Sequence, residues 1–318
     1  MRILITGANG FVGSHLVQAL LARGGADLYG VTRHVAWPAG WEDLGERIRL
    51  VQADLAAWPQ LTEYLRETQP DHIYHLAGYA DAGLSFKEPD AAWSGNLTAT
   101  RCLYDAIRQW GGKPRVLFIS SGAVYGEPID PQQPLSENSV LRPNSPYAVS
   151  KAAADLLSYQ YARAYDLDVV RARPFNHVGP GQSPRFALAH FAWQIAKIER
   201  GRSEATLRVG NLWTERDYTD VRDIVQAYLL LMEQEIAGEV YNIGYGETRT
   251  MQSYLDRLLA LTSAAIAVEN DASLTRKVET AKVRVNADML RQTTGWAPRI
   301  AVEDTLNDML EYCRKNVT

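Results

Sequence analysis

Tyr147 and Lys151 are the residues of this 318-residue chain whose types and spacing most directly suggest proton transfer. They begin and end the run YAVSK at 147–151, so on a helix the phenol and the ammonium would share one face. A neighbouring cation lowers the pKa of a tyrosine, which can then act as an acid or base near neutral pH. The spacing therefore predicts a helix that carries a Tyr–Lys proton-transfer pair.

A third polar group, Ser121, lies in the run SSGAVYG at 120–126, directly after a predicted strand. The carboxyl ends of strands face the ligand crevice of an open α/β sheet. We therefore expect Ser121 to hydrogen-bond the reacting oxygen beside Tyr147. The alternative is that Ser121 only caps a turn and Tyr147 only packs, but the presence of both residues together favours the catalytic interpretation.

A glycine-rich turn, GANGFVG at 7–13, follows the first predicted strand and opens a helical pattern. Glycines here permit a tight turn, let the backbone approach a pyrophosphate and allow close helix–strand packing, while the helix N-terminus supplies N–H donors. A turn that binds nothing is the alternative, and the position in the first βα unit argues against it. We expect a dinucleotide at this turn. The expected contacts are Gly7, Asn9, Gly10, Phe11, Val12 and Gly13.

The end of the second predicted strand indicates which dinucleotide is bound. An acidic residue there would accept hydrogen bonds from a ribose 2′-hydroxyl and repel a 2′-phosphate, but this chain has Arg33 followed by His34. Arginine pairs well with phosphate, so NADP(H) is favoured, with NAD(H) as the second candidate. A solvated surface charge is the alternative for Arg33. Asp54 and Leu55 are placed to frame an adenine ring, although Asp54 could equally be a helix N-cap.

Short β-branched runs alternate with helical patterns through the first half of the chain, which predicts an α/β fold with a parallel, doubly wound sheet. The predicted strands are Arg2–Thr6, Leu28–Thr32, Ile48–Gln52, His72–Leu76, Val116–Ser120 and Val169–Ala172. After Pro174 a Gly/Pro-rich loop begins a smaller lobe. Its predicted elements are helices at Arg185–Arg200, Val221–Glu235, Met251–Leu261, Ala287–Thr294 and Glu303–Arg314, and a strand at Glu239–Ile243. We expect a cofactor domain over 1–174, to which parts of 221–245 return, and a substrate lobe over 175–318.

Composition narrows the function classes. A net charge of −4 argues against nucleic acid and membrane surfaces as partners. The two cysteines, Cys102 and Cys313, are too few for a disulfide framework or a zinc site, and we expect no metal. The first residues lack the pattern of a secretory leader, and no apolar run approaches a membrane span. We therefore expect a cytoplasmic protein.

These motifs, together with HLAG at 75–78, SPYAVSK at 145–151 and RPFNHVGPGQ at 173–182, resemble the extended short-chain dehydrogenases/reductases over nearly the whole chain. That family comprises nucleotide-sugar epimerases, dehydratases and reductases. The resemblance implies a Rossmann-type domain, a C-terminal lobe for the nucleotide diphosphate, a homodimer formed through two helices per subunit, and a catalytic triad matching Ser121, Tyr147 and Lys151. The further cofactor contacts expected are Leu76, Ala77, Gly78, Asn96, Pro174 and His177.

Within the family, the runs at 173–182, 209–211 and 216–223 are most similar to the GDP-4-keto-6-deoxy-D-mannose reductases, which make GDP-D-rhamnose. The 4,6-dehydratases carry acidic side chains directly after the catalytic Ser/Thr, where this chain has Gly122 and Ala123. Neither residue can move a proton, which disfavours dehydration. Asp81 or Glu88 could replace those acids only by reaching the sugar from the loop after the fourth strand, which we do not favour.

A 4-epimerase resembles an NAD binder with an acidic residue after the second strand, which Arg33 does not match. The resemblance thus implies NAD(P)H-dependent reduction of the C4 ketone of a GDP-linked 4-keto-6-deoxyhexose. Tyr147 would deliver the proton, Ser121 would steady the oxyanion, and Lys151 would lower the pKa of Tyr147 and hold the nicotinamide ribose. GDP-mannose 4,6-dehydratase and nucleotide-sugar 4-epimerase remain alternatives. A non-catalytic NADP(H)-binding sensor or scaffold is the alternative outside enzymology.

Most substrate contacts are expected in the second lobe, where several arginines could bind a nucleotide diphosphate. Taken singly, each of these arginines is an ordinary surface charge. The resemblance implies that Asn176 and Arg216 contact the diphosphate. It also implies that Arg276 and Glu279 bind the diphosphate and the nucleoside ribose, although Lys277 replaces the proline usual in the family. The expected substrate contacts are Ser85, Phe86, Ser121, Asn176, Val209, Arg216, Arg276 and Glu279.

Overall fold

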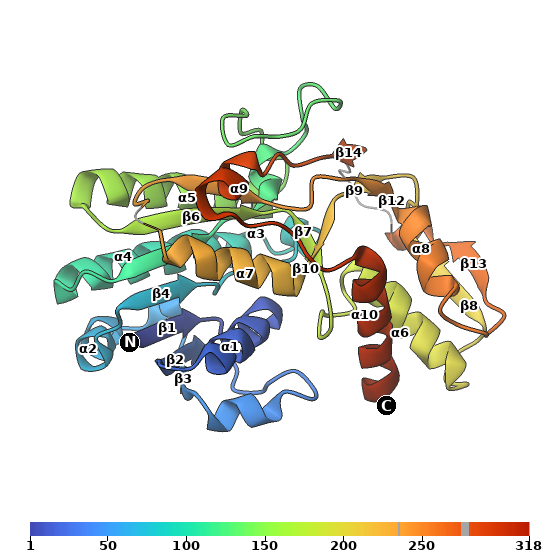
Figure 1. Cartoon of the computed structure of the whole chain (residues 1–318), viewed down its shortest axis with the longest axis horizontal. Coiled ribbons are helices and arrows are strands. Elements are labelled where there is room, and N and C mark those ends of the chain that lie inside the picture. The colour runs from blue at the N-terminus through green and yellow to red at the C-terminus, as the bar shows by residue number, and fades with distance from the viewer. Residues whose placement is uncertain (235, 275–279, 318) are drawn as a thin grey trace.

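A seven-stranded parallel sheet forms the centre of the larger domain in the computed structural model of the chain (Figure 1). The structure describes residues 1–234, 236–274 and 280–317. The strand order is β3-β2-β1-β4-β5-β6-β11, and all neighbours are parallel. The strands are β1 (Arg2–Thr6), β2 (Asp27–Thr32), β3 (Arg49–Gln52), β4 (His72–His75), β5 (Arg115–Ile119), β6 (Val169–Pro174) and β11 (Val240–Ile243). The predicted Rossmann-type, doubly wound sheet is confirmed.

Helices cover both faces of this sheet, which is why its strands are apolar on both sides. On one face α1 (Phe11–Arg23) and α7 (Val221–Met232) pack on the strands around Leu16 and Ile224. On the other face lie α2 (Leu61–Thr68), α4 (Ala99–Trp110) and α5 (Pro146–Tyr165). Short helical segments connect them: η1 (Glu42–Glu46), η2 (Leu55–Ala57), η3 (Leu84–Phe86), α3 (Pro89–Ala92), the π-helical η4 (Trp93–Thr98) and η5 (Gly122–Tyr125).

The chain reverses its winding direction between β1 and β4, and this switch point opens a crevice at the carboxyl ends of the strands. Gly7 fits there because its φ of +72° is left-handed and a Cβ would lie 3.0 Å from the backbone N of Ala77. A Cβ at Gly13 would lie 2.1 Å from the carbonyl O of Gly7. These glycines therefore let α1 start close beneath the end of β4.

Helix α5 carries the predicted proton-transfer pair and begins where the sequence has a strong start signal. The Oγ of Ser145 accepts a hydrogen bond from the backbone N of Ala148 at 3.1 Å, and Pro146 occupies the first helical position. Tyr147 and Lys151 follow within the first two turns. The cap thus fixes where these two side chains enter the crevice.

The smaller lobe lies on the right of Figure 1 and has its own apolar core, which includes Leu255 and Leu306. It consists mainly of α6 (Ala187–Glu199), α8 (Met251–Leu259), α10 (Val302–Asn316) and the pair β8 (Thr206–Val209) and β13 (Ala267–Asn270). It also contains η6 (Ala272–Leu274), β7 (Asn176–Val178) paired with β10 (Tyr218–Asp220), and the sheet of β12 (Arg249–Thr250), β9 (Glu215–Arg216) and β14 (Lys282–Val283). The remaining helix, α9 (Asp288–Thr294), packs against β11 of the large sheet.

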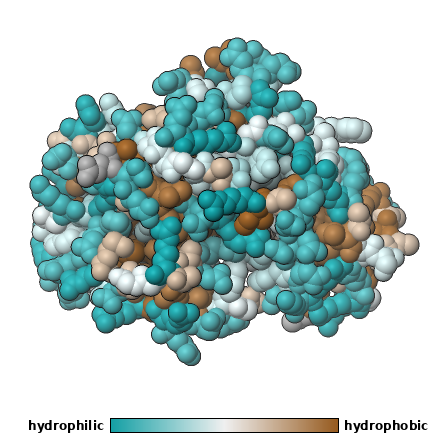
Figure 2. All heavy atoms as spheres, in the orientation of Figure 1, coloured by the Kyte–Doolittle hydropathy of each residue, from teal (hydrophilic) through white to brown (hydrophobic). Residues whose placement is uncertain are grey.

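Polar side chains predominate on the face drawn in Figure 2, where apolar side chains form small separate groups. In the described ranges, none of the helices combines the length and the apolar character that crossing a bilayer requires. The cysteines Cys102 and Cys313 are both free thiols.

Candidate active site

A cavity of about 1100 Å³ extends along the carboxyl ends of the strands, from the glycine turn to the second lobe. Its volume is slightly above the range of about 300–1,000 Å³ that is usual for small-molecule sites. Sixteen of the seventeen residues predicted to contact a cofactor line it. They are Gly7, Asn9, Gly10, Phe11, Val12, Gly13, Arg33, Asp54, Leu55, Leu76, Ala77, Gly78, Tyr147, Lys151, Pro174 and His177.

The glycine end of the cavity has the features that a dinucleotide requires. Helix α1 begins at Phe11 with Gly10 as its N-cap, and no side chain caps it, so its first N–H groups can bind a ligand. The space beside Gly7 and Gly13 is open only because these residues lack a Cβ. Arg33 is exposed on the cavity wall directly after β2. The residues present therefore fit a pyrophosphate at the turn and a 2′-phosphate near Arg33.

Asn9 lines the cavity, as its predicted contact with the cofactor requires, and it also joins two segments of the cavity wall. Its Oδ1 accepts a hydrogen bond from the Thr32 hydroxyl, and its Nδ2 donates to the backbone carbonyls of His34 and Ala36, the latter at 2.7 Å. The side chain thus ties the glycine turn to the segment that carries Arg33. Sequence spacing gave no sign of this link, because the two segments meet only after β1 and β2 pair.

Both interpretations of Asp54 are compatible with the structure. Its Oδ1 accepts a hydrogen bond from the backbone N of Ala56 at 3.0 Å and so caps η2. Asp54 and the following Leu55 also line the cavity near its adenosine end.

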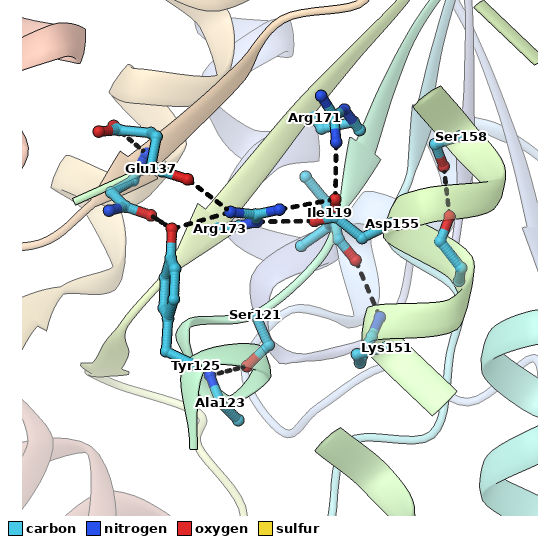
Figure 3. Close-up of polar contacts among 12 residues, drawn as sticks. Ile119, Ser121, Ala123, Tyr125, Glu137, Lys151, Asp155, Ser158, Arg171 and Arg173 are labelled. Atoms are coloured by element: carbon cyan, nitrogen blue, oxygen red, sulfur yellow. Dashed lines mark hydrogen bonds and ion pairs between the residues drawn. The ribbon is translucent and has the colours of Figure 1, made fainter. Parts of the chain in front are cut away.

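Ser121, Tyr147 and Lys151 come from two elements and line the middle of the cavity. Ser121 follows β5, and its Oγ accepts a hydrogen bond from the backbone N of Ala123 at 3.1 Å, which caps η5 (Figure 3). The side chain of Ser121 also lies close enough to the phenol of Tyr147 to lower its pKa. Ser121 therefore caps a turn and contacts Tyr147 at the same time.

Burial dominates the proton affinities of this pair. It raises the pKa of Tyr147, and the side chain of Ser121 offsets only part of that rise. Burial also lowers the pKa of Lys151 to about 8, with the Asp155 carboxylate opposing it. The Nζ of Lys151 donates to the carbonyl O of Ile119 at 2.9 Å (Figure 3). Burial therefore sets the net direction of the Tyr147 pKa, and the lowering expected from Lys151 stays a prediction.

A buried ion-pair network supports Lys151 from behind. Asp155, one turn further along α5, accepts from Arg171 at 2.8 Å and from two nitrogens of Arg173 at 2.8 and 2.9 Å. Arg173 in turn reaches the hydroxyl of Tyr125 at 2.9 Å (Figure 3). Removing one member of such a network would leave a buried charge unpaired. The network therefore locks α5 onto β6 and keeps Lys151 at the crevice.

Asn96 was predicted to contact the cofactor, but it lies behind the cavity wall. Its Nδ2 donates to the Oγ of Ser150 and its Oδ1 accepts from the backbone N of Tyr79, both at 2.9 Å. A Cβ at Gly78 would lie 2.6 Å from this Oδ1. The π-helical turn η4 directs Asn96 inward, and the sequence pattern did not reveal that turn. Asn96 therefore supports the wall formed by Gly78.

Two predicted substrate contacts also lie off the wall. Ser85 is fully buried, and its Oγ donates to the carbonyl O of Ala82 at 2.7 Å and accepts from the backbone N of Tyr147 at 3.2 Å. It positions the start of α5 instead of lining the cavity. Val209 is buried in the core of the second lobe. The sequence placed Ser85 and Val209 in segments near the substrate, but it did not indicate the directions of their side chains.

Phe86, Ser121, Asn176 and Arg216 are the predicted substrate contacts that do line the cavity. Arg276 and Glu279 lie outside the described residues. Gln182, Arg185 and Tyr228 also line the cavity and were missed. Gln182 and Arg185 lie in and just after the Gly/Pro-rich loop, which could have drawn attention to them, whereas Tyr228 lies in an apolar helical run that reads as core.

The position next to Ser121 has no room for an acidic side chain. A Cβ at Gly122 would lie 2.7 Å from the ring of Phe175, and Ala123 presents only a methyl group to the cavity. Asp81 lines the cavity, but its Oδ1 accepts from the backbone N of Leu84 at 2.8 Å. The acid and base that an elimination requires are therefore missing beside Ser121.

Comparison with known proteins gives consistent matches over the whole chain. A family model described as GDP-mannose 4,6 dehydratase matches residues 4–309. The GDP-6-deoxy-D-mannose reductase of Pseudomonas aeruginosa is 34% identical over 311 residues, 97% of this chain and 96% of that protein. The structure of RMD from Pseudomonas aeruginosa complexed with NADPH matches with a TM-score of 0.83 at 32% identity, covering 99% of both chains. A Thermus thermophilus UDP-glucose 4-epimerase complex with NAD matches with a TM-score of 0.87 at 28% identity, covering 99% of this chain and 100% of that one.

Proposed function

Because the chain belongs to the extended short-chain dehydrogenases/reductases, in the family described as GDP-mannose 4,6 dehydratase, we propose that it is a nucleotide-sugar 4-ketoreductase. The proposed reaction is reduction of GDP-4-keto-6-deoxy-D-mannose to GDP-D-rhamnose. The observation that carries this choice is the Ser121–Tyr147–Lys151 set in a cavity whose neighbouring position, Gly122, cannot hold a carboxylate. The similarity to the Pseudomonas aeruginosa reductase supports the same choice.

NADP(H) is the cofactor we propose, with NAD(H) as the second candidate. The uncapped start of α1 would hold the pyrophosphate, and Arg33 would hold the 2′-phosphate. When bound, the reduced nicotinamide supplies the hydride. The complex of the Pseudomonas aeruginosa protein with NADPH supports this assignment.

Tyr147 delivers the proton in the proposed reaction. Its raised pKa keeps the phenol protonated at neutral pH, as a proton donor requires. Ser121 hydrogen-bonds the oxygen on which negative charge develops, and the Lys151 ammonium favours the phenolate that remains after the transfer. Asn176 and Arg216 hold the nucleotide diphosphate on the side of the second lobe.

The direct test mixes purified protein with NADPH and GDP-4-keto-6-deoxy-D-mannose. We expect loss of the reduced-nicotinamide absorbance, and an NMR spectrum of the product should show the C4 configuration of rhamnose. Replacing Tyr147 with Phe should lower turnover by about 10²- to 10⁴-fold and leave the Kd for NADPH nearly unchanged, since only the proton donor is lost. No absorbance change with the wild-type protein would refute the reductase, and activity surviving in Tyr147→Phe would assign the proton to another residue.

Two competitors are separated by their substrates. A dehydratase would form a 4-keto sugar from GDP-mannose in the presence of oxidised cofactor, and we expect none. The structural similarity to UDP-glucose 4-epimerase makes epimerisation the second candidate, and it would convert UDP-glucose without net change in the cofactor. A sensor or scaffold would bind NADPH and turn over none of these substrates.

We also propose a cytoplasmic homodimer. Helix α5 exposes Leu156 and Tyr159, and the adjacent η4 exposes Trp93, so apolar side chains lie on the outer side of these helices. The family resemblance implies pairing through two helices per subunit, and this surface suits it.

A further inference from the structure

Tyr228 is a buried phenol that the catalytic scheme above does not use. It lies in α7 and lines the cavity, although its exposed fraction is 0%. Its hydroxyl has no hydrogen-bond partner among the described residues. Tyr228 is thus a polar group at the edge of a ligand site that the chain itself leaves unsatisfied.

An unsatisfied buried hydroxyl is expensive to keep. Leaving one without a partner costs about 1–3 kcal/mol, and buried tyrosines nearly always find a hydrogen bond. The hydroxyls of Tyr104 and Tyr125, which are also fully buried, bond Ser158 at 2.8 Å and Asn242 at 2.7 Å. Burial raises the pKa of Tyr228, so its hydroxyl stays neutral and can both donate and accept. A bound ligand is therefore the natural partner for it.

The position of Tyr228 indicates which part of the ligand it meets. The Tyr147 phenol contributes to the raised pKa of Tyr228, and both residues line the same cavity. Ile119 and Pro174, at the ends of β5 and β6, also line the cavity, and both β5 and β6 pack against α7. The proton donor must lie beside the reacting carbon, so this is the nicotinamide end of the cavity, opposite Arg33.

Nicotinamide has one group that can satisfy such a hydroxyl, its carboxamide, which offers both a carbonyl acceptor and an amino donor. We propose that the Tyr228 hydroxyl hydrogen-bonds the carboxamide of the nicotinamide ring, an inference that rests on the cofactor of the proposed function. The bond restricts rotation of the ring about its link to the ribose. Tyr228 is then a cofactor-binding residue that helps select the face of the ring turned toward the substrate.

The test replaces Tyr228 with Phe, which removes one oxygen and keeps the ring. Without ligand, we expect the melting temperature to stay the same or rise, because an unsatisfied group is lost. The Kd for NADPH, measured by calorimetry, should rise about 3- to 10-fold, the equivalent of one hydrogen bond. The Kd for adenosine 2′,5′-bisphosphate, which has the adenosine end and no nicotinamide, should not change.

Tyr64→Phe is the matched control. Its hydroxyl is also buried without a partner among the described residues, but Tyr64 lies in α2 and does not line the cavity. This variant should leave the Kd values of both ligands unchanged. The inference would be overturned, and the proposed reductase would stand, if Tyr228→Phe left the Kd for NADPH unchanged. The same holds if the Kd for the bisphosphate rose as much as the Kd for NADPH. Failure of the wild-type protein to bind NADPH would overturn both.

Discussion

Desolvation sets the proton chemistry of individual residues in this site. Lys151 is buried enough to bring its pKa to about 8, while burial moves the pKa of Tyr147 upward. At neutral pH both groups carry their protons, which suits reduction because the phenol donates one. The ammonium is held by the carbonyl of Ile119 and remains available to stabilise the phenolate formed afterwards.

The pH dependence of ketone reduction should reflect the loss of the proton from Lys151. Because its pKa is lowered to about 8, the ammonium is lost as pH rises through 8 instead of above 10. We expect kcat/KM to be level below pH 8 and to fall about tenfold per pH unit above it. In Lys151→Arg the guanidinium stays charged, so any remaining activity should lack this falling limb. An identical limb in both proteins would assign it to another group.

His75 should make the protein sensitive to acid. It is fully buried at the end of β4, with its ring nitrogens 2.8 Å from the Thr6 hydroxyl and 3.0 Å from that of Thr100. Burial lowers its pKa to about 3, below its unfolded value, so the folded state binds fewer protons and the free energy of unfolding falls as pH drops from about 6.5 toward 3.

At pH 5 this linkage amounts to about 2 kcal/mol relative to pH 7. Urea unfolding at pH 5 and pH 7 measures how much the free energy of unfolding changes between them. This change should be smaller in His75→Gln than in the wild type by the contribution of His75, whatever the absolute stability of the variant. Equal pH dependence in the two proteins would mean that His75 does not control the acid response.

At the level of elements, the glycine turn and the segment after β2 act as one unit through Asn9. The Asn9 amide donates hydrogen bonds to the backbone carbonyls of His34 and Ala36. These residues follow Arg33, and all three line the cavity. The preference for a 2′-phosphate therefore depends on a side chain that itself need not touch the phosphate.

Asn9→Ala should weaken NADPH binding more than NADH binding. Loss of these hydrogen bonds frees the segment that presents Arg33, and we expect the Kd for NADPH to rise about 3- to 10-fold with a smaller change for NADH. Arg33→Ala is the comparison and should show the same preference more strongly. Equal weakening of both cofactors by Asn9→Ala would place Asn9 against the pyrophosphate instead.

The whole molecule exposes an apolar surface on α5 and η4 that fits pairing with a second copy. Leu156 is 56% exposed and Tyr159 46%, high values for large apolar side chains on a helix. In Leu156→Asp a charge would have to be buried in the dimer interface, so sedimentation should show the mass of one chain where the wild type shows two. Ile129→Asp, at a 75% exposed position outside α5 and η4, should remain dimeric. A monomeric wild type would remove the dimer proposal.

The sequence alone determined the fold class, and nearly all of the cofactor contacts predicted from it line the cavity. The βαβ rhythm and the glycine turn depend on local rules, so β1, the start of α1 and a helix through Tyr147 and Lys151 could be predicted. The motifs at Ser121, Tyr147 and Lys151 sit at strand and helix ends, which a parallel sheet brings to one edge. The division into domains and the roles of the site residues remain predictions.

Only the tertiary structure decided which side chains face the ligand and how strongly their protons are held. Asn96 and Ser85 turned out to support the wall because a π-helical turn and a short helix point them inward, which no spacing rule revealed. Tyr228 has the sequence pattern of a core residue, yet it lines the cavity, and its buried hydroxyl has no partner among the described residues. The pKa values of Tyr147 and Lys151 moved in directions set by burial. Desolvation and side-chain direction depend on the whole packed molecule, because they are fixed by neighbours that are distant in the sequence.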